Sequence, residues 1–396
     1  MSTGIRRKLA WGGLGTLLGI GIAVLVLLTV ARSPAEQPPA GAPAAPPLLS
    51  ESEGAIREVA LHYVPKIAGA VRQTYTDFLR ALPRDVTLRI VIADDLSTAD
   101  QQRLRSFLDG IDPGLWHRTR IVPSPGPITT WSKDRALVTE PSPTGPAWLI
   151  AAAEPDRKWP ERHGDWLTVT SLAGSSPHRF ERHVAPFDFD AGDFAVAQGR
   201  VIVDANLILK NQRRGIVDAG GLERRLEAWL DAPVIVLGTR PGDTPPHHLS
   251  MYLTPLHDDV MLVGDPRRAR DLVGPDYRPG TDSAETGRAL TADFSETTQR
   301  RFDTAAEQLS QLGYRVIRVP NVPLEDKTYI TYTNGVYETR NGRRIAYLPT
   351  YGIDELDLAA RETYARLGWE VRPIQVRHVY PFHGTIGCLV NVLARG

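Results

Sequence analysis

The sequence predicts an α/β fold in which one strand–strand–helix–strand unit is repeated about five times, with pseudo-symmetry, around a common axis. Two observations lead to this prediction. Segments typical of strands and of helices alternate along the chain, and the same order returns at a spacing of roughly 55–75 residues. The 396 residues are 42% hydrophobic and 23% charged, a composition typical of a folded globular protein. One transmembrane helix is predicted to precede this fold.

Residues 1–32 are predicted to form a single-pass membrane anchor. Residues 9–31 carry no charge, and Arg6, Arg7 and Lys8 precede them. A basic flank of this kind stays on the cytoplasmic side, which places the body of the protein on the extracytoplasmic side. A cleaved signal peptide is the alternative, although its apolar core usually has only about 7–15 residues. The length of the apolar run favours an uncleaved anchor.

A linker is predicted to follow the anchor. Residues 33–50 are rich in Pro and Ala and carry almost no charge, which indicates a semi-extended spacer between the membrane and the folded part. Residues 51–396 are therefore predicted to form the folded domain.

Hydrophobic periodicity, caps and turn signals predict the elements of this domain. Residues 51–82 have apolar positions at helical spacing, which Pro65 breaks or kinks. Ser97 is a suitable N-cap for a helix that Gly110 ends, and Asn341-Gly342 is the strongest hairpin signal in the chain. Further helices are predicted at residues 222–230, 296–312 and 356–367. Strands are predicted at residues 86–93, 118–122, 148–153, 234–237, 315–319, 329–337, 344–348, 371–376 and 384–393. Two-strand units are predicted at 194–203, with a turn at Gln198-Gly199, and at 252–263.

Charge balance and cysteine content exclude several classes of function. Lys and Arg number 46, as do Asp and Glu, and no basic block is present, so nucleic-acid binding is not expected. Cys388 is the only cysteine, which excludes a disulfide framework and a zinc site built from cysteines. A lone cysteine is either a buried apolar residue or a thiol with a function.

A short polar segment stands where the hairpin of each predicted unit begins. In chain order the segments are Trp131-Ser-Lys-Asp134, Asp190-Ala-Gly-Asp193, His247-His248-Leu-Ser250, Thr331-Tyr-Thr-Asn334 and Gly384-Thr-Ile-Gly-Cys388. Each segment alone has an ordinary interpretation, as a surface ion pair at Asp134 or a turn at Asn334. Equivalent strand ends converge near the axis of a pseudo-symmetric fold, so together the five segments predict one site.

A metal site is an alternative interpretation of the histidines. His247, His248 and His257 lie close in sequence, with Asp258 and Asp259 beside the last of them. A predicted strand separates His257 from His248 by roughly 30 Å when extended, so no metal is expected.

At the five polar segments the sequence resembles the pentein superfamily of guanidino-modifying enzymes, most closely the branch of agmatine deiminases and bacterial peptidylarginine deiminases. Trp131-Ser-Lys-Asp134 is similar to the Trp-x-Arg-Asp motif of that branch, and Gly384-Thr-Ile-Gly-Cys388 to its Gly-x-Ile-His-Cys motif. The segments at Asp190, His248 and Tyr332 resemble its Glu-Gly-Gly, His-x-Asp-Met and Tyr-x-Asn motifs. The resemblance implies a five-bladed α/β propeller, in agreement with the five predicted units.

The resemblance also implies a hydrolase that needs no cofactor. Cys388 would attack the guanidinium carbon to form a covalent thiouronium intermediate, and His248 would act as general acid and base. Asp134 and Asp190 would hold the guanidinium of a small-molecule or peptidyl substrate. The remaining implied substrate-binding residues are Trp131, Ser250 and Asn334.

Three residues depart from the pattern of the branch. Ser250 stands in place of a second guanidinium-binding Asp, Asp190 is one methylene shorter than Glu, and Gly387 replaces a His. A hydroxyl accepts a hydrogen bond but does not neutralise a cation, so Ser250 leaves alternatives open. The first is a deiminase-like hydrolase that releases ammonia or an amine from an arginine-derived substrate. The second is a catalytically degenerate pentein that binds without turnover, and the third is amidino transfer to an amine.

Overall fold

The structure, a computed structural model, describes residues 45–142, 145–156, 159, 162–280, 286–287 and 289–396. The predicted membrane segment, residues 9–31, and linker residues 33–44 lie outside the described residues. Within the described part of the chain, no helix is both long enough and apolar enough to cross a membrane.

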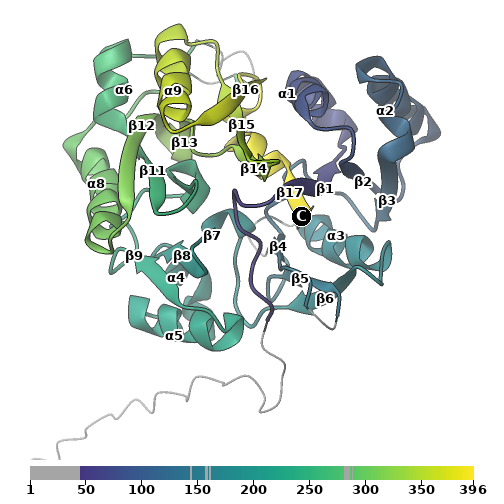
Figure 1. Ribbon diagram of the computed structural model, residues 1–396, viewed down its shortest axis with the longest axis horizontal. Helices are drawn as coiled ribbons and strands as arrows, with labels where there is room; N and C mark the ends of the chain where they lie inside the picture. Colours follow the sequence, from purple (N-terminus) through teal and green to yellow (C-terminus); the bar gives the residue numbers. More distant parts are fainter. Residues whose placement is uncertain (1–44, 143–144, 157–158, 160–161, 281–285, 288) are drawn as a thin grey trace, which may run out of the picture. The chain divides into compact units, whose positions relative to one another are not determined.

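Five small sheets surround a common centre, and the longer helices lie on their outer sides (Figure 1). In each sheet the first strand is antiparallel to the second, and the second is parallel to the third. The predicted set of five repeated units is therefore confirmed. Grouped by sheet, the strands are β17 (Asn391–Arg395), β1 (Ile56–His62), β2 (Thr87–Ala93) and β3 (Thr119–Ser124); β4 (Ala136–Val138), β5 (Ala147–Ala151) and β6 (Phe180–Val184); β7 (Ala195–Ala197), β8 (Arg200–Asp204) and β9 (Val234–Leu237); β10 (Leu253–Pro255), β11 (Val260–Asp265), β12 (Arg315–Leu324) and β13 (Thr328–Thr331); β14 (Val336–Arg340), β15 (Arg343–Thr350) and β16 (Trp369–Gln375).

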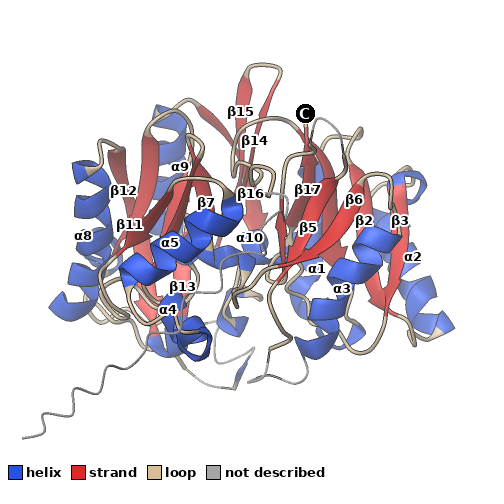
Figure 2. Cartoon of the chain, turned by 90° about the horizontal axis from the view of Figure 1, so that it is seen from below, coloured by secondary structure: helices blue, strands red, loops and turns tan. Residues whose placement is uncertain are grey.

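A helix connects the second and third strands of every unit and buries one face against the strands. In α5, for example, Leu222, Leu226 and Leu230 are buried at a spacing of four residues. Figure 2 shows α3 and α5 covering the outer faces of their sheets. The connecting helices are α1 (Ala68–Ala81), α3 (His163–Gly174), α5 (Ala219–Leu230), α6 (Pro266–Val273) with α8 (Glu296–Gln311), and α9 (Asp354–Arg366), and the others are α2 (Thr98–Ile111), α4 (Leu207–Asn211) and α10 (Ile386–Leu389).

The first and last strands of the domain lie side by side in one sheet. β17 is antiparallel to β1, with Ala60 opposite Asn391 and Ile56 opposite Arg395. The C-terminal strand therefore completes the sheet that the first strand begins, and this pairing closes the ring of sheets.

Residues 51–82 do not form the single helical segment that the sequence predicts. Residues 56–62 form β1, and helix α1 begins only at Ala68. All residues of β1 except Arg57 are buried, and β1 pairs with β17 and β2 on its two sides. Periodicity alone does not distinguish a short buried strand from a buried helix, because pairing with distant strands decides the outcome.

The local signals are mostly confirmed. Gln198 and Gly199 have φ values of 51° and 70°, and Asn341 and Gly342 have values of 51° and 74°, as tight hairpin turns with two left-handed residues require. The Ser97 side chain accepts a hydrogen bond from the backbone of Asp100 and so caps α2. The helix continues through Gly110 to Ile111, so this glycine is not its end.

The end of the predicted linker packs against the domain. Ala45, Leu48 and Leu49 are buried, and the Leu49 backbone amide donates to the Val138 carbonyl at 2.9 Å. Glu51 follows, and its carboxylate lies 3.0 Å from the ammonium of Lys133, beside the predicted site.

Candidate active site

The five polar segments occupy equivalent places in the fold. Each immediately precedes the first strand of a sheet: β4, β7, β10, β14 and β17. The last of them is not the strand that the sequence predicts. Residues 386–389 form the single helical turn α10, because the backbones of Cys388 and Leu389 hydrogen-bond to the Thr385 carbonyl, and β17 begins only at Asn391.

Hydrogen bonds join neighbouring segments to one another. The Ala191 backbone donates to the carbonyl of Asp134 at 2.7 Å, and the Lys133 backbone donates to the carbonyl of Cys388 at 3.2 Å. The Gly387 backbone donates to the carbonyl of Asn334 at 3.2 Å. Elements distant in sequence thus fix one another's positions, which suits a site that must hold side chains in a defined geometry.

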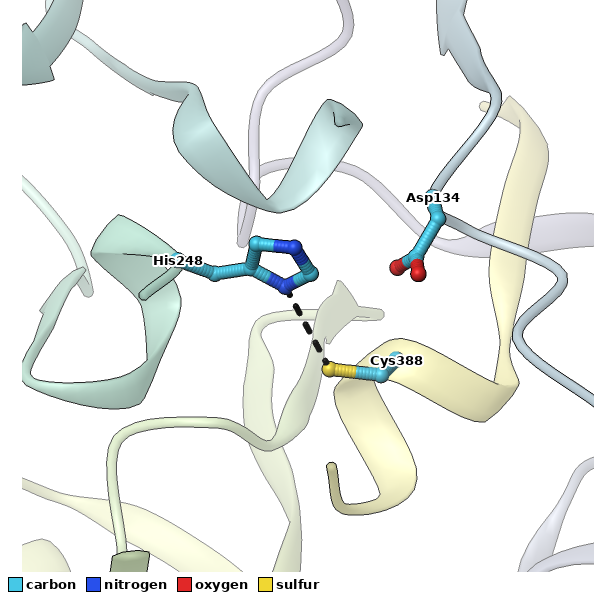
Figure 3. Close-up of side chains that lie close together, drawn as sticks. All are labelled: Asp134, His248 and Cys388. Atoms are coloured by element: carbon cyan, nitrogen blue, oxygen red, sulfur yellow. Dashed lines mark hydrogen bonds between the residues drawn. The ribbon is translucent and has the colours of Figure 1, made fainter. Parts of the chain in front are cut away.

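Cys388, His248 and Asp134 point toward one another at the centre of these segments (Figure 3). One side-chain atom of each lies within 4.8 Å of the others, and all three residues are buried. The sulfur of Cys388 lies 4.0 Å from Nδ1 of His248. The sequence therefore located three residues that the structure brings together from the segments before β4, β10 and β17.

His248 lies between the thiol and a second carboxylate. Its Nε2 is 3.6 Å from Oδ2 of Asp190. A Cβ atom at Gly192 would come within 2.6 Å of Nδ1, so only glycine allows the ring to lie here. Burial alone would lower the pKa of His248, but the carboxylates of Asp134 and Asp190 outweigh it and hold that pKa well above its ordinary value. The ring is therefore held as an imidazolium.

The two carboxylates have different surroundings. Burial raises the pKa of Asp134 in spite of the cationic His248 and Arg162 beside it. Burial opposes ionisation of Asp190 as well, but Lys210 and Arg135 hold its pKa well below the ordinary value. Asp190 is consequently a fixed anion. At Asp134 the neighbouring cations do not offset the effect of burial, so its ionised form is less favoured.

Three cations that the sequence analysis did not place in the site accompany these carboxylates. Lys210 lies 2.7 Å from Asp190, Arg135 lies 3.2 Å from Asp190, and Arg162 lies 2.5 Å from Asp134. Arg135 could have been found, because it follows Asp134 directly. Lys210 and Arg162 belong to α4 and to the start of α3, and no motif marks them.

Asn334 connects Ser250 with the cysteine. Its Nδ2 is 2.8 Å from Ser250 Oγ and 3.4 Å from Cys388 Sγ, and its Oδ1 accepts from Thr385 Oγ1 at 2.6 Å. A Cβ atom at Gly387 would lie 2.7 Å from Oδ1 of Asn334. The glycine that departs from the pattern of the branch thus makes room for the asparagine side chain.

The Trp131 side chain packs against the backbone that leads into α10. A Cβ atom at Gly384 would lie 2.5 Å from the Trp131 ring, so the ring packs directly on this glycine. Ser132, next to it, has its Oγ 2.7 Å from the carbonyl of Leu389. Both contacts hold the segment that carries Asp134 against the turn that carries Cys388.

Asp134, His248 and Cys388 place an oxygen, a nitrogen and a sulfur within 4.8 Å of one another, but an imidazolium at His248 has no lone pair to offer a metal ion. His257, the other candidate ligand, bonds instead to Asp258 at 3.0 Å and lies 6.0 Å from the ring of Trp369. The histidines that are close in sequence therefore do not form one ligand set.

No protein-family model and no curated protein matches this sequence. Solved structures do resemble it. An agmatine deiminase of C. jejuni has a TM-score of 0.63 at 13% identity, covering 88% of this chain and 96% of that one. An agmatine deiminase of Enterococcus faecalis has a TM-score of 0.60 at 14% identity, over 88% and 96%. A protein provisionally assigned as a peptidyl-arginine deiminase has a TM-score of 0.64 at 16% identity, over 88% and 99%.

These similarities define the class of fold. The chain has the pentein fold, a ring of five α/β units, as the five segments predicted. Within that fold it resembles agmatine deiminases and the provisionally assigned peptidyl-arginine deiminase, the branch named from the sequence.

Proposed function

We propose that the protein is a deiminase-like hydrolase that acts on a guanidino compound through Cys388. One observation carries the proposal: a thiol, a cationic imidazole and a buried carboxylate lie within 4.8 Å of one another. This combination supplies a nucleophile, a proton donor and an anion that attracts a planar cation. Its place in a pentein fold shared with agmatine deiminases supports the same reaction class.

The substrate guanidinium would be held by Asp134. Its Oδ1 is buried and has no hydrogen-bond partner, so it can accept an N–H of the substrate. Asp190 would act mainly through His248, whose ring it orients at 3.6 Å. Burial strengthens these interactions, because few waters compete for the same groups.

The first half of the reaction forms a covalent intermediate. The imidazolium of His248 and the amide of Asn334, which lies 3.4 Å from the sulfur, both favour the thiolate. The thiolate attacks the guanidinium carbon and forms a C–S bond. His248 gives its proton to one nitrogen, which leaves as ammonia or an amine, and a thiouronium group remains on Cys388. The separation of 4.0 Å between sulfur and Nδ1 leaves the leaving nitrogen room to approach both atoms.

The second half releases the product. Neutral His248 takes a proton from water, and the resulting hydroxide adds to the thiouronium carbon. The C–S bond then breaks as the hydroxyl of the adduct loses its proton to solvent, where the released ammonia or amine takes it up, and the thiolate and imidazolium are restored. The balance is one guanidinium and one water converted into one ureido group and one ammonium ion, with no change of oxidation state.

The test is a substrate panel of arginine, agmatine, methylarginines and arginyl peptides, with ammonia and ureido product measured together. We expect one of these compounds to give both products in equal amounts, and Cys388→Ala to abolish them. Cys388→Ser is the matched control for volume. A wild-type protein with a reactive thiol that converts none of the panel contradicts the proposal.

A binding protein without turnover is the second candidate, and one observation favours it. The hydroxyl of Ser250 already accepts from Asn334 and brings no negative charge to the site. Tight binding of a guanidino compound without product supports this candidate over the hydrolase.

We also propose that residues 1–32 anchor the protein in a membrane, with the domain on the extracytoplasmic side. The uncharged run and its basic flank support this. Fractionation should place the full chain in the membrane and a chain that begins at residue 33 in the soluble fraction. Recovery of the full chain as a soluble protein contradicts the anchor, and N-terminal sequencing identifies a cleaved signal.

A further inference from the structure

The carboxylate proposed to hold the substrate already holds a guanidinium of the chain itself. Nη2 of Arg162 lies 2.5 Å from Oδ2 of Asp134 and 3.6 Å from Oδ1 of Asp190. The side chain of Arg162 is 16% exposed, so its head group lies within the site rather than over it. It is thus in the position that a guanidino ligand of these two acids would take.

The other two cations of the site are each bound to a further carboxylate. Lys210 bonds to Asp190 at 2.7 Å and to Asp193 at 2.5 Å. Arg135 donates to Asp156 at 2.8 Å and lies 3.2 Å from Asp190. Both neutralise Asp190, and neither contacts Asp134 within ion-pair distance. Among the described residues, Arg162 therefore decides whether Asp134 is available to a substrate guanidinium.

Arg162 itself makes few bonds for a buried guanidinium. The bond to Asp134 is the one hydrogen bond of its side chain among the described residues, and its Nε is buried without a hydrogen-bond partner. Asp156 and Asp165 lie 3.7 Å away, beyond hydrogen-bond distance. A guanidinium has five N–H donors, so most of its bonding capacity is unused here. Its departure from Asp134 would break one hydrogen bond and weaken the longer ion pairs with Asp156, Asp165 and Asp190, and an incoming guanidinium can replace both the bond and the charge.

The side chain can leave without moving a secondary-structure element. Arg162 is the N-cap residue of α3, with φ −91° and ψ 4°, so it stands before the first turn of the helix. A long, unbranched side chain at such a position changes rotamer without disturbing the helical hydrogen bonds.

We propose that Arg162 is an internal competitor for the guanidinium subsite, so that a substrate binds by displacing it from Asp134. The inference rests on the proposed function for the identity of the subsite. With an internal competitor, the apparent affinity of every ligand equals its intrinsic affinity multiplied by the fraction of time for which the subsite is empty. A lone guanidinium ion gains little by the exchange, so a substrate must add contacts outside the subsite. Arg162 thereby selects substrates that carry more than the guanidino group.

The test uses alkylation of Cys388, which needs no turnover. In 2-chloroacetamidine and 2-chloroacetamide the thiolate displaces chloride and forms a thioether, but only the amidine is a cation that Asp134 can hold. In Arg162→Gln we expect the rate with the amidine to rise about tenfold, the equivalent of one hydrogen bond to a charged group, and the rate with the amide to stay within about twofold. Arg162→Lys should lie between wild type and Arg162→Gln.

Arg214→Gln is the matched control. Arg214 also pairs with carboxylates, Asp188 at 2.8 Å and Glu154 at 3.1 Å. Its substitution by Gln removes the same charge as Arg162→Gln, but outside the site. We expect it to change neither rate. An unchanged ratio of the two rates in Arg162→Gln, or equal increases in both arginine variants, overturns the inference. If Arg162→Gln does not fold, the ratio of amidine to amide rates in Arg162→Lys tests the inference instead.

The outcome is separable from that of the proposed function. A raised amidine rate in Arg162→Gln with no conversion of any substrate supports the internal competitor and contradicts the hydrolase. Turnover by wild type, together with an unchanged ratio of amidine to amide rates in Arg162→Gln, supports the hydrolase and contradicts the internal competitor.

Discussion

His248 lies 3.6 Å from Asp190, and this pair links the segments that precede β10 and β7. Asp190 is kept ionised by Lys210 and Arg135, so it is a permanent anion beside the imidazole. The anion keeps the imidazole protonated, as the proposed proton transfer to the leaving nitrogen requires. In the proposed reaction this buried ion pair serves proton transfer, and it need not add to stability.

We predict that Asp190→Asn shifts the alkaline limit of activity to lower pH. The pKa of His248 is raised in the folded protein, so the imidazolium is lost only as pH rises through that raised value. Removal of the carboxylate lowers the pKa of His248, and the imidazolium is then lost at lower pH. A decrease of about 10²-fold in kcat/KM near neutral pH is expected, since general acid catalysis typically contributes about 10²–10⁴-fold.

The pH dependence of Cys388 alkylation by a neutral reagent measures the same effect without substrate. Asp188→Asn is the control, because Asp188 binds Arg214 outside the site. Superimposable pH profiles for wild type and Asp190→Asn would show that Asp190 does not set the protonation of His248.

A second prediction concerns Asp204, which lies outside the catalytic group. Burial raises the pKa of Asp204 to about 6, although Tyr252 donates to its carboxylate at 2.6 Å. A carboxyl with a raised folded pKa binds its proton more tightly in the folded state, so it stabilises the fold at acid pH and this stability is lost as pH rises from about 4 to 6. Relative to wild type, Asp204→Asn should therefore gain up to about 3 kcal/mol of unfolding free energy between pH 4 and pH 7.

Denaturant unfolding of both proteins at several pH values checks this prediction. The difference between the two curves isolates Asp204 from the other titrating groups. A difference that is constant with pH would mean that Asp204 has an ordinary pKa in the folded protein.

The sequence predicted the ring of units and the residues at its centre because both are encoded locally. Asn341-Gly342 and Gln198-Gly199 specify turns through their own backbone preferences. Cys388, His248 and Asp134 could be grouped because each precedes the first strand of a repeated unit. Strand β1 was mistaken for helix, because its pairing with β17 depends on residues at the other end of the chain.

The electrostatic composition of the site was not predictable in the same way. Lys210 and Arg162 reach the carboxylates of Asp190 and Asp134 from helices α4 and α3, at no fixed spacing from any motif. Sequence alone gave two acids and one histidine, which implies a strongly anionic pocket. Only the packing of the helices shows that cations of the chain already neutralise it.

A third prediction tests the glycine beside the cysteine. Gly387→Ala places a Cβ atom 2.7 Å from Oδ1 of Asn334 and 3.0 Å from the carbonyl of Gly335. Since hydrogen bonds to Ser250 and Thr385 fix the Asn334 side chain, we expect a loss of about 1–3 kcal/mol of stability, typical of overpacking, and slower alkylation of Cys388 as Asn334 moves from the sulfur. Thermal unfolding and alkylation rates measure the two effects.

Gly110→Ala is the matched control for this substitution. Gly110 lies within α2 with no atom near the added Cβ, so alanine should stabilise the protein by about 0.5–1 kcal/mol. Gly387→Ala with wild-type stability and wild-type thiol reactivity would mean that the space around Asn334 is not limiting.

The last prediction concerns Ser250 and separates the hydrolase from the binding protein. Asp at this position adds a carboxylate next to Asn334, which now donates to the serine hydroxyl at 2.8 Å. A further anion beside Asn334, whose amide also lies 3.4 Å from Cys388, strengthens the attraction for a guanidinium. Ser250→Asp should therefore lower KM for a guanidino substrate about tenfold, as one charge-assisted hydrogen bond would. Ser250→Asn keeps the size without the charge and should leave KM near the wild-type value. If wild type has no turnover but Ser250→Asp does, the missing carboxylate is what makes the natural chain a binding protein. If both turn over and KM does not change, Ser250 serves Asn334 alone and the substrate cation is held entirely by the carboxylates already present.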